Sequence, residues 1–373
     1  PGTCTPWLKL TLNSCIWTPA PLSVMMLLTA ASFGLAAGCV APGTCTPPAA
    51  KYSRVIAGPQ PSQQWNINGG FCGAMSVQQA ALAFGAWISQ DLVRKANTHG
   101  EGHGDAQDGY EILPSNVGET AKNLKLTYDE WDYNQPSPQA PAFKKWIKAH
   151  LTKGEPIVFF PMCKGDSHCP YTDSCPNGGH FDHVEPMWGI FSNHSLDDPE
   201  VYDDDVILHG SDQDLETYYR PMSTLEDDSN MEGNCKEAGA GFGKNEMYPC
   251  VDKDVTYGIS VTGLATKGTL PVSLTVDTTE EPDVRMFQKP SELHGTVTVS
   301  GLTVGSSYVL YRFKGTENLP TGPNFEGSGF RTPFNATDTT WTYADPEPFM
   351  SNTATYYVAT VAPYAAVPDT VVV

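Results

Sequence analysis

One cysteine between glycines is the residue of this chain best suited to act as a nucleophile. Cys72 stands in Asn-Gly-Gly-Phe-Cys-Gly-Ala-Met-Ser, residues 68–76, and apolar side chains follow it at helical spacing as far as Ile88. The pattern predicts a helix that begins near Cys72, where backbone N–H groups and the helix dipole favour an anion. Such a position lowers the pKa of a thiol and raises the fraction of nucleophilic thiolate. The alternative is an inert core cysteine or half of a disulfide.

A nucleophilic thiol needs a base, and the stretch Gly-Gly-His-Phe-Asp-His-Val-Glu-Pro-Met-Trp-Gly, residues 178–189, offers the best one. His183 stands at the start of a predicted strand, 184–191, and is our choice. His180 lies close by, and His194 and His209 are further candidates. The alternative for each is a surface histidine or one that the core satisfies.

The elements that must position these residues are predicted as helices first and strands afterwards. Helices are expected within 74–88, 89–95, 113–124 and 141–151, and strands at 156–161, 184–191 and 206–208. This order is typical of the α+β class. We therefore expect a signal and leader region at 1–50, a linker at 51–61 and an α+β domain at 62–255.

The composition changes from about Thr256 to Thr, Val, Gly and Ser, with apolar and polar positions alternating. Short strands separated by turn residues predict an antiparallel all-β sandwich domain over 256–373. Residues 301–308 resemble the corner of a fibronectin type III domain. No catalytic cluster stands there, so we expect this domain to contact a surface or a glycan, or to support its neighbour.

Taken together, the Cys72 stretch and the Asp182-His183 pair with Gly189 resemble papain-like cysteine peptidases, and more closely their bacteriocin-processing-like (C39-like) branch. The resemblance covers about half the chain. It implies a papain-like fold in which the cysteine begins the central helix of one lobe and the histidine begins a strand of the other.

The resemblance also implies two supporting residues. The third member of the catalytic group, Asn or Asp, ends the next strand, where Asp212 fits by residue type and His209 is nearer in position. The oxyanion is stabilised by a Gln before the cysteine, here Gln64 or Gln63.

The implied function is that of a cysteine peptidase, which hydrolyses peptide or protein substrates through an acyl-enzyme and needs no cofactor. Two alternatives stay open. An amine can capture the same acyl-enzyme, which would give a transglutaminase-like transferase. The chain can also be a binding or structural protein that uses a peptidase-like fold without the chemistry.

Charge limits the choice of partner. Asp and Glu number 42 against 22 Lys and Arg, and the formal net charge of −20 argues against nucleic acid or an anionic membrane. The acidic residues concentrate in 197–254, for which a solvated acidic loop is the favoured interpretation. The alternative is a Ca²⁺ site around Asp203, Asp204, Asp205, Asp212 and Asp214.

Ten cysteines in a chain rich in Gly and Pro indicate an oxidising compartment. Residues 22–37 are apolar and uncharged and end in small residues, which resembles a signal peptide. We therefore expect a secreted, extracellular or cell-surface protein; Cys39 in a lipoprotein-like box is a weaker alternative. Asn193 and Asn335 begin glycosylation sequons.

The remaining cysteines and histidines are assigned to structure. Disulfides are favoured over zinc for the trio Cys163, Cys169 and Cys175. A further disulfide is expected between Cys235 and Cys250. The two histidines of the Gly-rich segment 99–103 are expected in a loop, because its glycines disfavour a zinc-binding helix.

Overall fold

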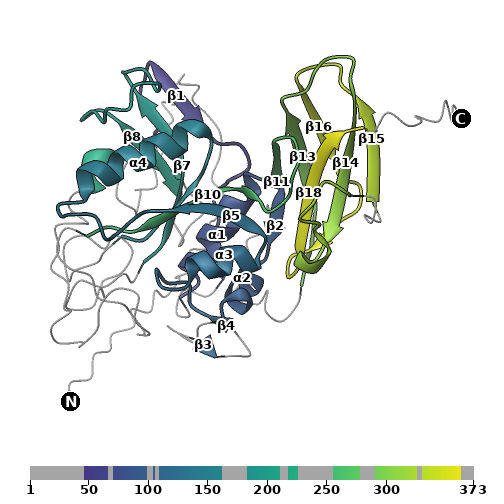
Figure 1. Ribbon diagram of the computed structural model, residues 1–373, viewed down its shortest axis with the longest axis horizontal. Coiled ribbons are helices and arrows are strands. Elements are labelled where there is room, and N and C mark those ends of the chain that lie inside the picture. The colour runs from purple at the N-terminus through teal and green to yellow at the C-terminus, as the bar shows by residue number, and fades with distance from the viewer. Residues whose placement is uncertain are drawn as a thin grey trace, which may run out of the picture. The chain divides into compact units, whose positions relative to one another are not determined.

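The computed structural model describes residues 46–65, 70–98, 104–105, 109–161, 183–210, 217–225, 255–277, 290–325 and 330–362. Every described residue belongs to one compact unit, whose elements are labelled in Figure 1.

Four helices belong to the first half of this unit. They are α1 (Cys72–Leu82), α2 (Gln90–Ala96), α3 (Val117–Asn123) and α4 (Ala140–Lys153). The helix expected to continue to Ile88 ends at Leu82 instead. Gly85 reverses the chain with φ +75°, and a Cβ there would lie 2.7 Å from Val272 Cγ1. Residues Ala86–Ile88 then form strand β2.

Seven antiparallel strands form the main sheet, in the order β5-β10-β6-β7-β8-β9, with β1 paired to β7. Their bounds are β1 Tyr52–Val55, β5 Leu126–Glu130, β6 Ile157–Phe159, β7 Glu185–Ser192, β8 Val206–Gly210, β9 Thr217–Pro221 and β10 Gly258–Leu264. A short 3-10 helix, η2 (Met222–Thr224), follows β9. Helices together with antiparallel sheets confirm the α+β class.

Two strands of this sheet lie outside the segment expected to form it. β1 falls in the expected linker, and β10 follows the expected domain boundary at 255, yet both pair within the main sheet. Their partners are distant in sequence, so local composition could not assign them.

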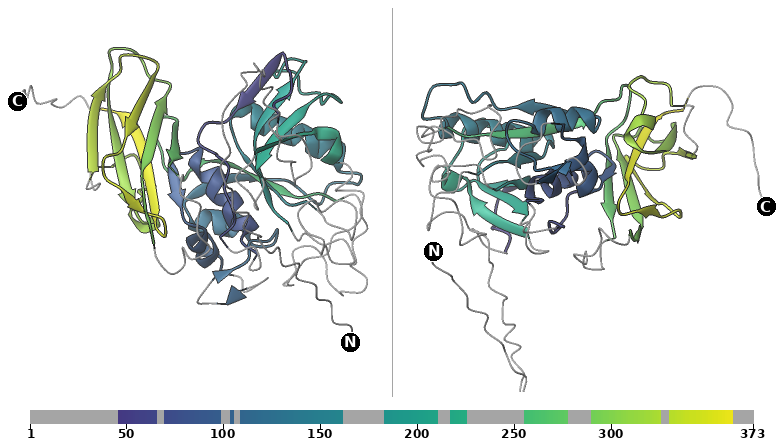
Figure 2. Two further views of the ribbon diagram at one scale, coloured as in Figure 1. Left: turned by 180° about the vertical axis from the view of Figure 1, so that it is seen from behind. Right: turned by 90° about the horizontal axis from the view of Figure 1, so that it is seen from below.

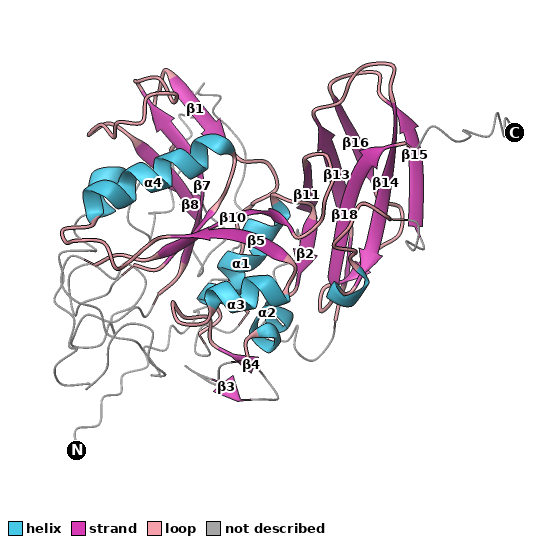
Figure 3. Ribbon diagram, viewed as in Figure 1, coloured by secondary structure: helices cyan, strands magenta, loops and turns pink. Residues whose placement is uncertain are grey.

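The described residues after 270 form strands in two further sheets, coloured magenta in Figure 3. One sheet has the order β11-β13-β16, with bounds Val272–Val276, Gly295–Ser300 and Thr340–Ala344. The other has the order β15-β14-β18-β2, with bounds Phe330–Asn335, Ser307–Lys314 and Ala354–Val361 for its first three strands. We call these residues the β-sandwich region, because buried side chains of both sheets share one core cluster.

Short elements complete the described part. β12 (Glu292–Leu293) pairs with β17 (Phe349–Met350), and β3 (Gly104–Asp105) pairs with β4 (Gly109–Tyr110). A single-turn helix, η3 (Thr316–Asn318), follows β14. None of the described helices is long and apolar enough to span a membrane.

The main sheet is covered differently on its two faces. Phe143, Ile147 and Leu151 of α4 pack with Ile157 and Phe159 of β6 in one core cluster. Val158 of β6 and Val184, which directly precedes β7, belong to the other cluster, together with α1 and the β-sandwich region. Figure 2 shows these layers from two further sides. As a result α1 is buried along its whole length.

Candidate functional site

Cys72 is the first residue of α1, as the sequence predicted. It is present as a thiol, and only 5% of its surface is exposed. The first turn of α1 contains no acidic residue, so no carboxylate of that turn offsets the partial positive charge of the helix terminus. The partial positive charge of this helix terminus favours an anion at the first residue of α1.

Two glycines give the chain the sharp entry into α1 that the sequence suggested. Gly70 has φ +64°, and a Cβ there would lie 1.9 Å from Glu111 Oε1. A Cβ on Gly73 would lie 2.7 Å from Ile112 Cβ. Side chains at either position would displace the loop that precedes Cys72.

Ser76 joins the first turn of α1 to the segment that carries His183. Its hydroxyl lies 2.9 Å from the carbonyl oxygen of Cys72 and 3.2 Å from the carbonyl oxygen of Val184. Val184 follows His183 directly, and His183 is buried just before β7. One side-chain hydroxyl thus spans the backbone of the predicted nucleophile and the backbone next to the predicted base.

The predicted third member, Asp212, lies outside the described residues, as does Asp182. The alternative, His209, is described: it is buried on β8, and its Nδ1 lies 3.4 Å from Glu185 Oε2. Arg220 on β9 donates from Nη1 to Glu185 Oε1 at 2.9 Å. Glu185 therefore forms a buried ionic cluster with side chains of β8 and β9.

Glu185 is a buried carboxylate held in its charged form. Burial alone would raise the pKa of the Glu185 carboxyl, but the positive charges of His209, Arg220 and His183 outweigh burial and hold it well below its usual range.

Sequence reasoning missed Glu185 as a functional residue. A signal existed: Glu185 stands two positions after His183 at the start of a strand, and residues two apart share a face. What the sequence could not give was the pair of cations, His209 and Arg220, which arrive from separate strands.

Gln64, the predicted oxyanion donor, lies in the segment that precedes α1. It is buried, and its Oε1 accepts a hydrogen bond from the backbone N–H of Phe71 at 3.0 Å. The Gln64 carboxamide is thus bound to the residue that directly precedes Cys72, and its NH₂ group is the donor end. Gln63 contributes its backbone carbonyl instead, which accepts from Gln90 Nε2 at 2.9 Å.

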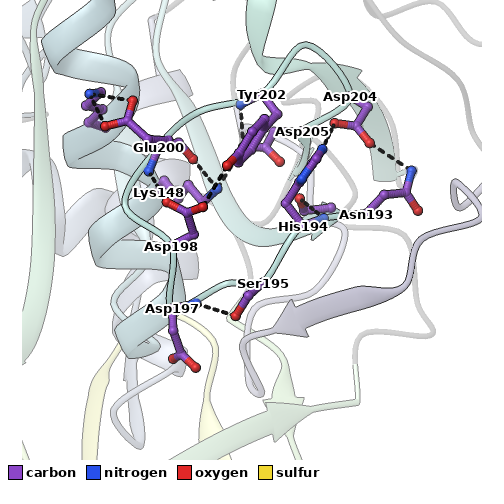
Figure 4. Close-up of polar contacts among 12 residues, drawn as sticks. Lys148, Asn193, His194, Ser195, Asp197, Asp198, Glu200, Tyr202, Asp204 and Asp205 are labelled. Atoms are coloured by element: carbon purple, nitrogen blue, oxygen red, sulfur yellow. Dashed lines mark hydrogen bonds and ion pairs between the residues drawn. The ribbon is translucent and has the colours of Figure 1, made fainter.

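The acidic segment after β7 is held by contacts within the protein (Figure 4). Asp205 is buried, and its Oδ2 lies 3.0 Å from Lys148 Nζ. Asp204 accepts a hydrogen bond from Asn193, which is the main cause that lowers the pKa of Asp204. Within the described ranges, no group of three or more His, Cys, Asp or Glu residues could hold a metal ion. Asp212 and Asp214 of the suggested Ca²⁺ site lie outside those ranges.

His194 belongs to the same segment and not to the Cys72 site. Its ring stacks on Tyr202 with 3.5 Å between centroids, and its Nε2 lies 3.4 Å from Asp204 Oδ1. It is partly exposed, and its contacts are those of a surface histidine.

Several predictions fall on residues outside the described part of the chain and stay predictions. They are the signal-like segment 22–37, Cys39, the disulfides of Cys163, Cys169, Cys175, Cys235 and Cys250, and the histidines at 99, 103 and 180.

Comparisons of this chain with family models, with curated proteins and with solved structures found no match. The arrangement of Cys72, His183, Glu185 and Gln64 is therefore the basis for assigning a function.

Proposed function

We propose that this protein is a cysteine peptidase of papain-like fold, similar to the bacteriocin-processing-like branch. The observation that carries the proposal is the Ser76 hydroxyl, which spans Cys72 and the residue after His183. A buried helix that begins with a thiol and packs against an antiparallel sheet supports it further. In that fold, the helix start supplies the nucleophile and the strand start supplies the base.

The proposed reaction begins with the thiolate of Cys72 and the imidazolium of His183. The sulfur forms a bond to the carbonyl carbon of the peptide, and the π electron pair moves onto the carbonyl oxygen. The backbone N–H of Cys72 and the NH₂ group of Gln64 donate hydrogen bonds to that oxyanion. The intermediate then collapses, the C–N bond breaks, and the leaving amine takes the proton from His183.

Water completes the cycle. His183, now neutral, removes a proton from water, and the resulting hydroxide attacks the thioester carbon. The C–S bond breaks, the product leaves as a carboxylic acid that releases its proton to solvent, and Cys72 is again a thiolate beside the imidazolium.

Labelling with iodoacetamide tests this proposal. Cys72 alkylation, followed by peptide mass spectrometry, should have its pH midpoint well below about 8.5, the ordinary value for a thiol. In His183→Ala the midpoint should return towards that value, whereas His194→Ala, a matched control, should leave it unchanged. Identical pH profiles in the wild type and His183→Ala would rule out the thiolate–imidazolium pair.

We further propose that the protein acts outside the cell and that the β-sandwich region contacts a surface or glycan. The signal-like segment 22–37 and the ten cysteines support the first point. Mass spectrometry of the protein recovered from the medium of an expressing host would test it. A mature chain that retains residues 22–37 inside the cell would contradict secretion.

A further inference from the structure

The segment that carries Gln64 is clamped on both sides by one buried side chain. Gln90, the first residue of α2, is fully buried. Its Oε1 accepts from the backbone N–H of Trp65 at 2.9 Å, and its Nε2 donates to the carbonyl oxygen of Gln63 at 2.9 Å. One carboxamide therefore fixes the residues immediately before and after Gln64.

A second buried glutamine continues this chain of amides. Gln78 on α1 accepts at Oε1 from Gln90 Nε2 at 3.3 Å and donates from Nε2 to the carbonyl oxygen of Ile88 at 2.9 Å. Both hydrogens of the Gln90 amide are thereby used, which fixes the orientation of that group. The Gln78 amide is oriented in the same way by its contacts to Gln90 and Ile88.

The series of side-chain amide hydrogen bonds ends at β2, which is paired with β18 of the β-sandwich region. Ile88 lies on β2, where it pairs with Ala354 of β18. The Trp87 indole N–H donates to the carbonyl oxygen of Ser351 at 3.1 Å, and the Ser89 backbone N–H donates to that of Thr353 at 3.1 Å. The strand that accepts from Gln78 is thus itself held by the β-sandwich region.

We propose that Gln90 and Gln78 are positioning residues for the oxyanion donor Gln64, and that the β-sandwich region supports this arrangement through β2. The inference rests on the proposed peptidase function. An oxyanion donor contributes only when its N–H is held where negative charge develops, because reorganisation during the reaction costs rate. The hydrogen bond from Phe71 to Gln64 and the Gln90 clamp together supply that restraint.

The test compares Gln90→Met with Gln79→Met in the full chain. Gln79 is a buried glutamine of the same α1, but its Oε1 accepts from the backbone N–H of Gln60, outside the clamp. Three quantities are measured: the alkylation rate of Cys72 by iodoacetamide, the inhibition constant of a peptide aldehyde, and kcat and KM for a peptide substrate. Alkylation needs no oxyanion donor, whereas the hemithioacetal formed from an aldehyde places its oxygen in the oxyanion site.

In Gln90→Met we expect aldehyde affinity and kcat to fall by about 10- to 100-fold, with KM and the alkylation rate within about twofold of the wild type. Gln79→Met should change none of these values by more than about twofold. Combining Gln90→Met with Gln64→Ala should add little to Gln64→Ala alone, since both remove the same interaction.

A Gln90→Met protein that folds and binds the aldehyde as tightly as the wild type would overturn the inference. If Gln90→Met does not fold, Gln78→Met replaces it. That variant keeps both bonds of Gln90 to residues 63 and 65 and removes the contact that helps to orient the Gln90 amide. Unchanged aldehyde affinity in Gln78→Met would also overturn the inference. Trp87→Phe, which removes only the indole bond to Ser351, should lower aldehyde affinity by about two- to fivefold, and no change would overturn the role of the β-sandwich region. Absence of Cys72 alkylation in the wild type would instead refute the proposed function.

Discussion

Two buried ionic clusters, one in the main sheet and one in the β-sandwich region, use similar side chains for different purposes. In the β-sandwich region, Asp345 Oδ2 lies 2.6 Å from Arg312 Nη1 and accepts from the Tyr357 hydroxyl at 2.6 Å. Burial and the Asp345 hydrogen bond raise the pKa of Tyr357 well above its usual value. Both contacts hold β14 and β18 to the turn after β16, so the cluster acts as a structural link.

The cluster of Glu185, His209 and Arg220 also joins neighbouring strands, but it lies two residues from His183 and close to the start of α1. The carboxylate is therefore near the residue that acts as the base in the proposed reaction. The comparison shows that a buried ion pair does not by itself indicate function: the group that it faces decides its role.

The largest expected difference between the two clusters concerns activity. Cys72→Ala or His183→Ala should lower peptide hydrolysis by at least about 10³-fold, since each removes a partner of the acyl transfer. Asp345→Asn should leave the activity per folded molecule within about twofold. The activities of all these variants are measured as initial rates, normalised to the amount of folded protein that circular dichroism gives. Loss of activity in a folded Asp345→Asn protein would contradict the purely structural role of the Asp345 cluster.

The second difference concerns stability. Asp345→Ala should lower the free energy of unfolding by about 1–3 kcal/mol, because it removes the buried acceptor of Arg312 Nη1 and of the Tyr357 hydroxyl and leaves Arg312 with its ion pair to Glu347. Urea unfolding followed by tryptophan fluorescence measures the change. Arg312→Met with Asp345→Leu, which removes both charges, should recover part of the loss; a double variant no more stable than Asp345→Ala would argue against the link.

Substitution of Glu185 should affect chemistry more mildly. In Glu185→Gln the cluster keeps its shape but loses its negative charge two residues from His183. We expect the iodoacetamide rate at neutral pH to fall by about 10-fold, equivalent to about 1.4 kcal/mol. Stopped-flow alkylation measures it, with Asp345→Asn as the matched control; equal rates in the wild type and Glu185→Gln would assign Glu185 a structural role alone.

The pH dependence of stability should separate the clusters as well. The pKa of Glu185 in the folded protein is lowered from 4.5, so the unfolded chain binds this proton at a higher pH than the folded chain does. Stability from this group is therefore complete above about pH 4.5 and is lost progressively as the pH falls further. Urea unfolding between pH 5 and pH 3 should show a shallower slope in Glu185→Gln than in the wild type or Asp345→Asn. Parallel slopes would contradict the lowered pKa.

The smallest expected effect lies at the edge of the β-sandwich region. Phe334 of β15 stacks on Trp341 of β16, with 3.7 Å between centroids and 7° between planes. Phe334→Leu should lower the free energy of unfolding by about 1 kcal/mol and leave alkylation of Cys72 unchanged. Differential scanning calorimetry measures the first quantity; a fall in the alkylation rate would show that this edge influences the site.

Local sequence patterns predicted the elements that position the site better than they predicted its electrostatics. The start of α1 at Cys72 was predicted because glycines and a helical apolar period are local features. The end of α1 was wrong, because the reversal at Gly85 depends on contact with Val272 in the β-sandwich region. For the same reason β1, β2 and β10 could not be assigned: each pairs with a strand that is distant in sequence.

The residues of the candidate site also differ in whether local sequence could identify them. Gln64 was chosen because the resemblance places a Gln before the cysteine, and the structure shows its side chain bonded to Phe71, next to Cys72. Its role stays a prediction. Glu185 was overlooked, because its burial is tolerable only with Arg220 and His209 arriving from β9 and β8. Sequence spacing identifies residues of one segment, whereas burial of charge is a property of several segments packed together.

Direct detection of an acyl-enzyme tests the central claim that Cys72 is a nucleophile. The protein is mixed with an N-acylglycine p-nitrophenyl ester, quenched in acid within milliseconds, digested and examined by mass spectrometry. We predict one acyl group on the peptide that contains Cys72, removed by hydroxylamine and absent from Cys72→Ala. Ester and peptide hydrolysis that continue at the wild-type rate in Cys72→Ala, or an acyl group found only on another residue, would contradict the claim.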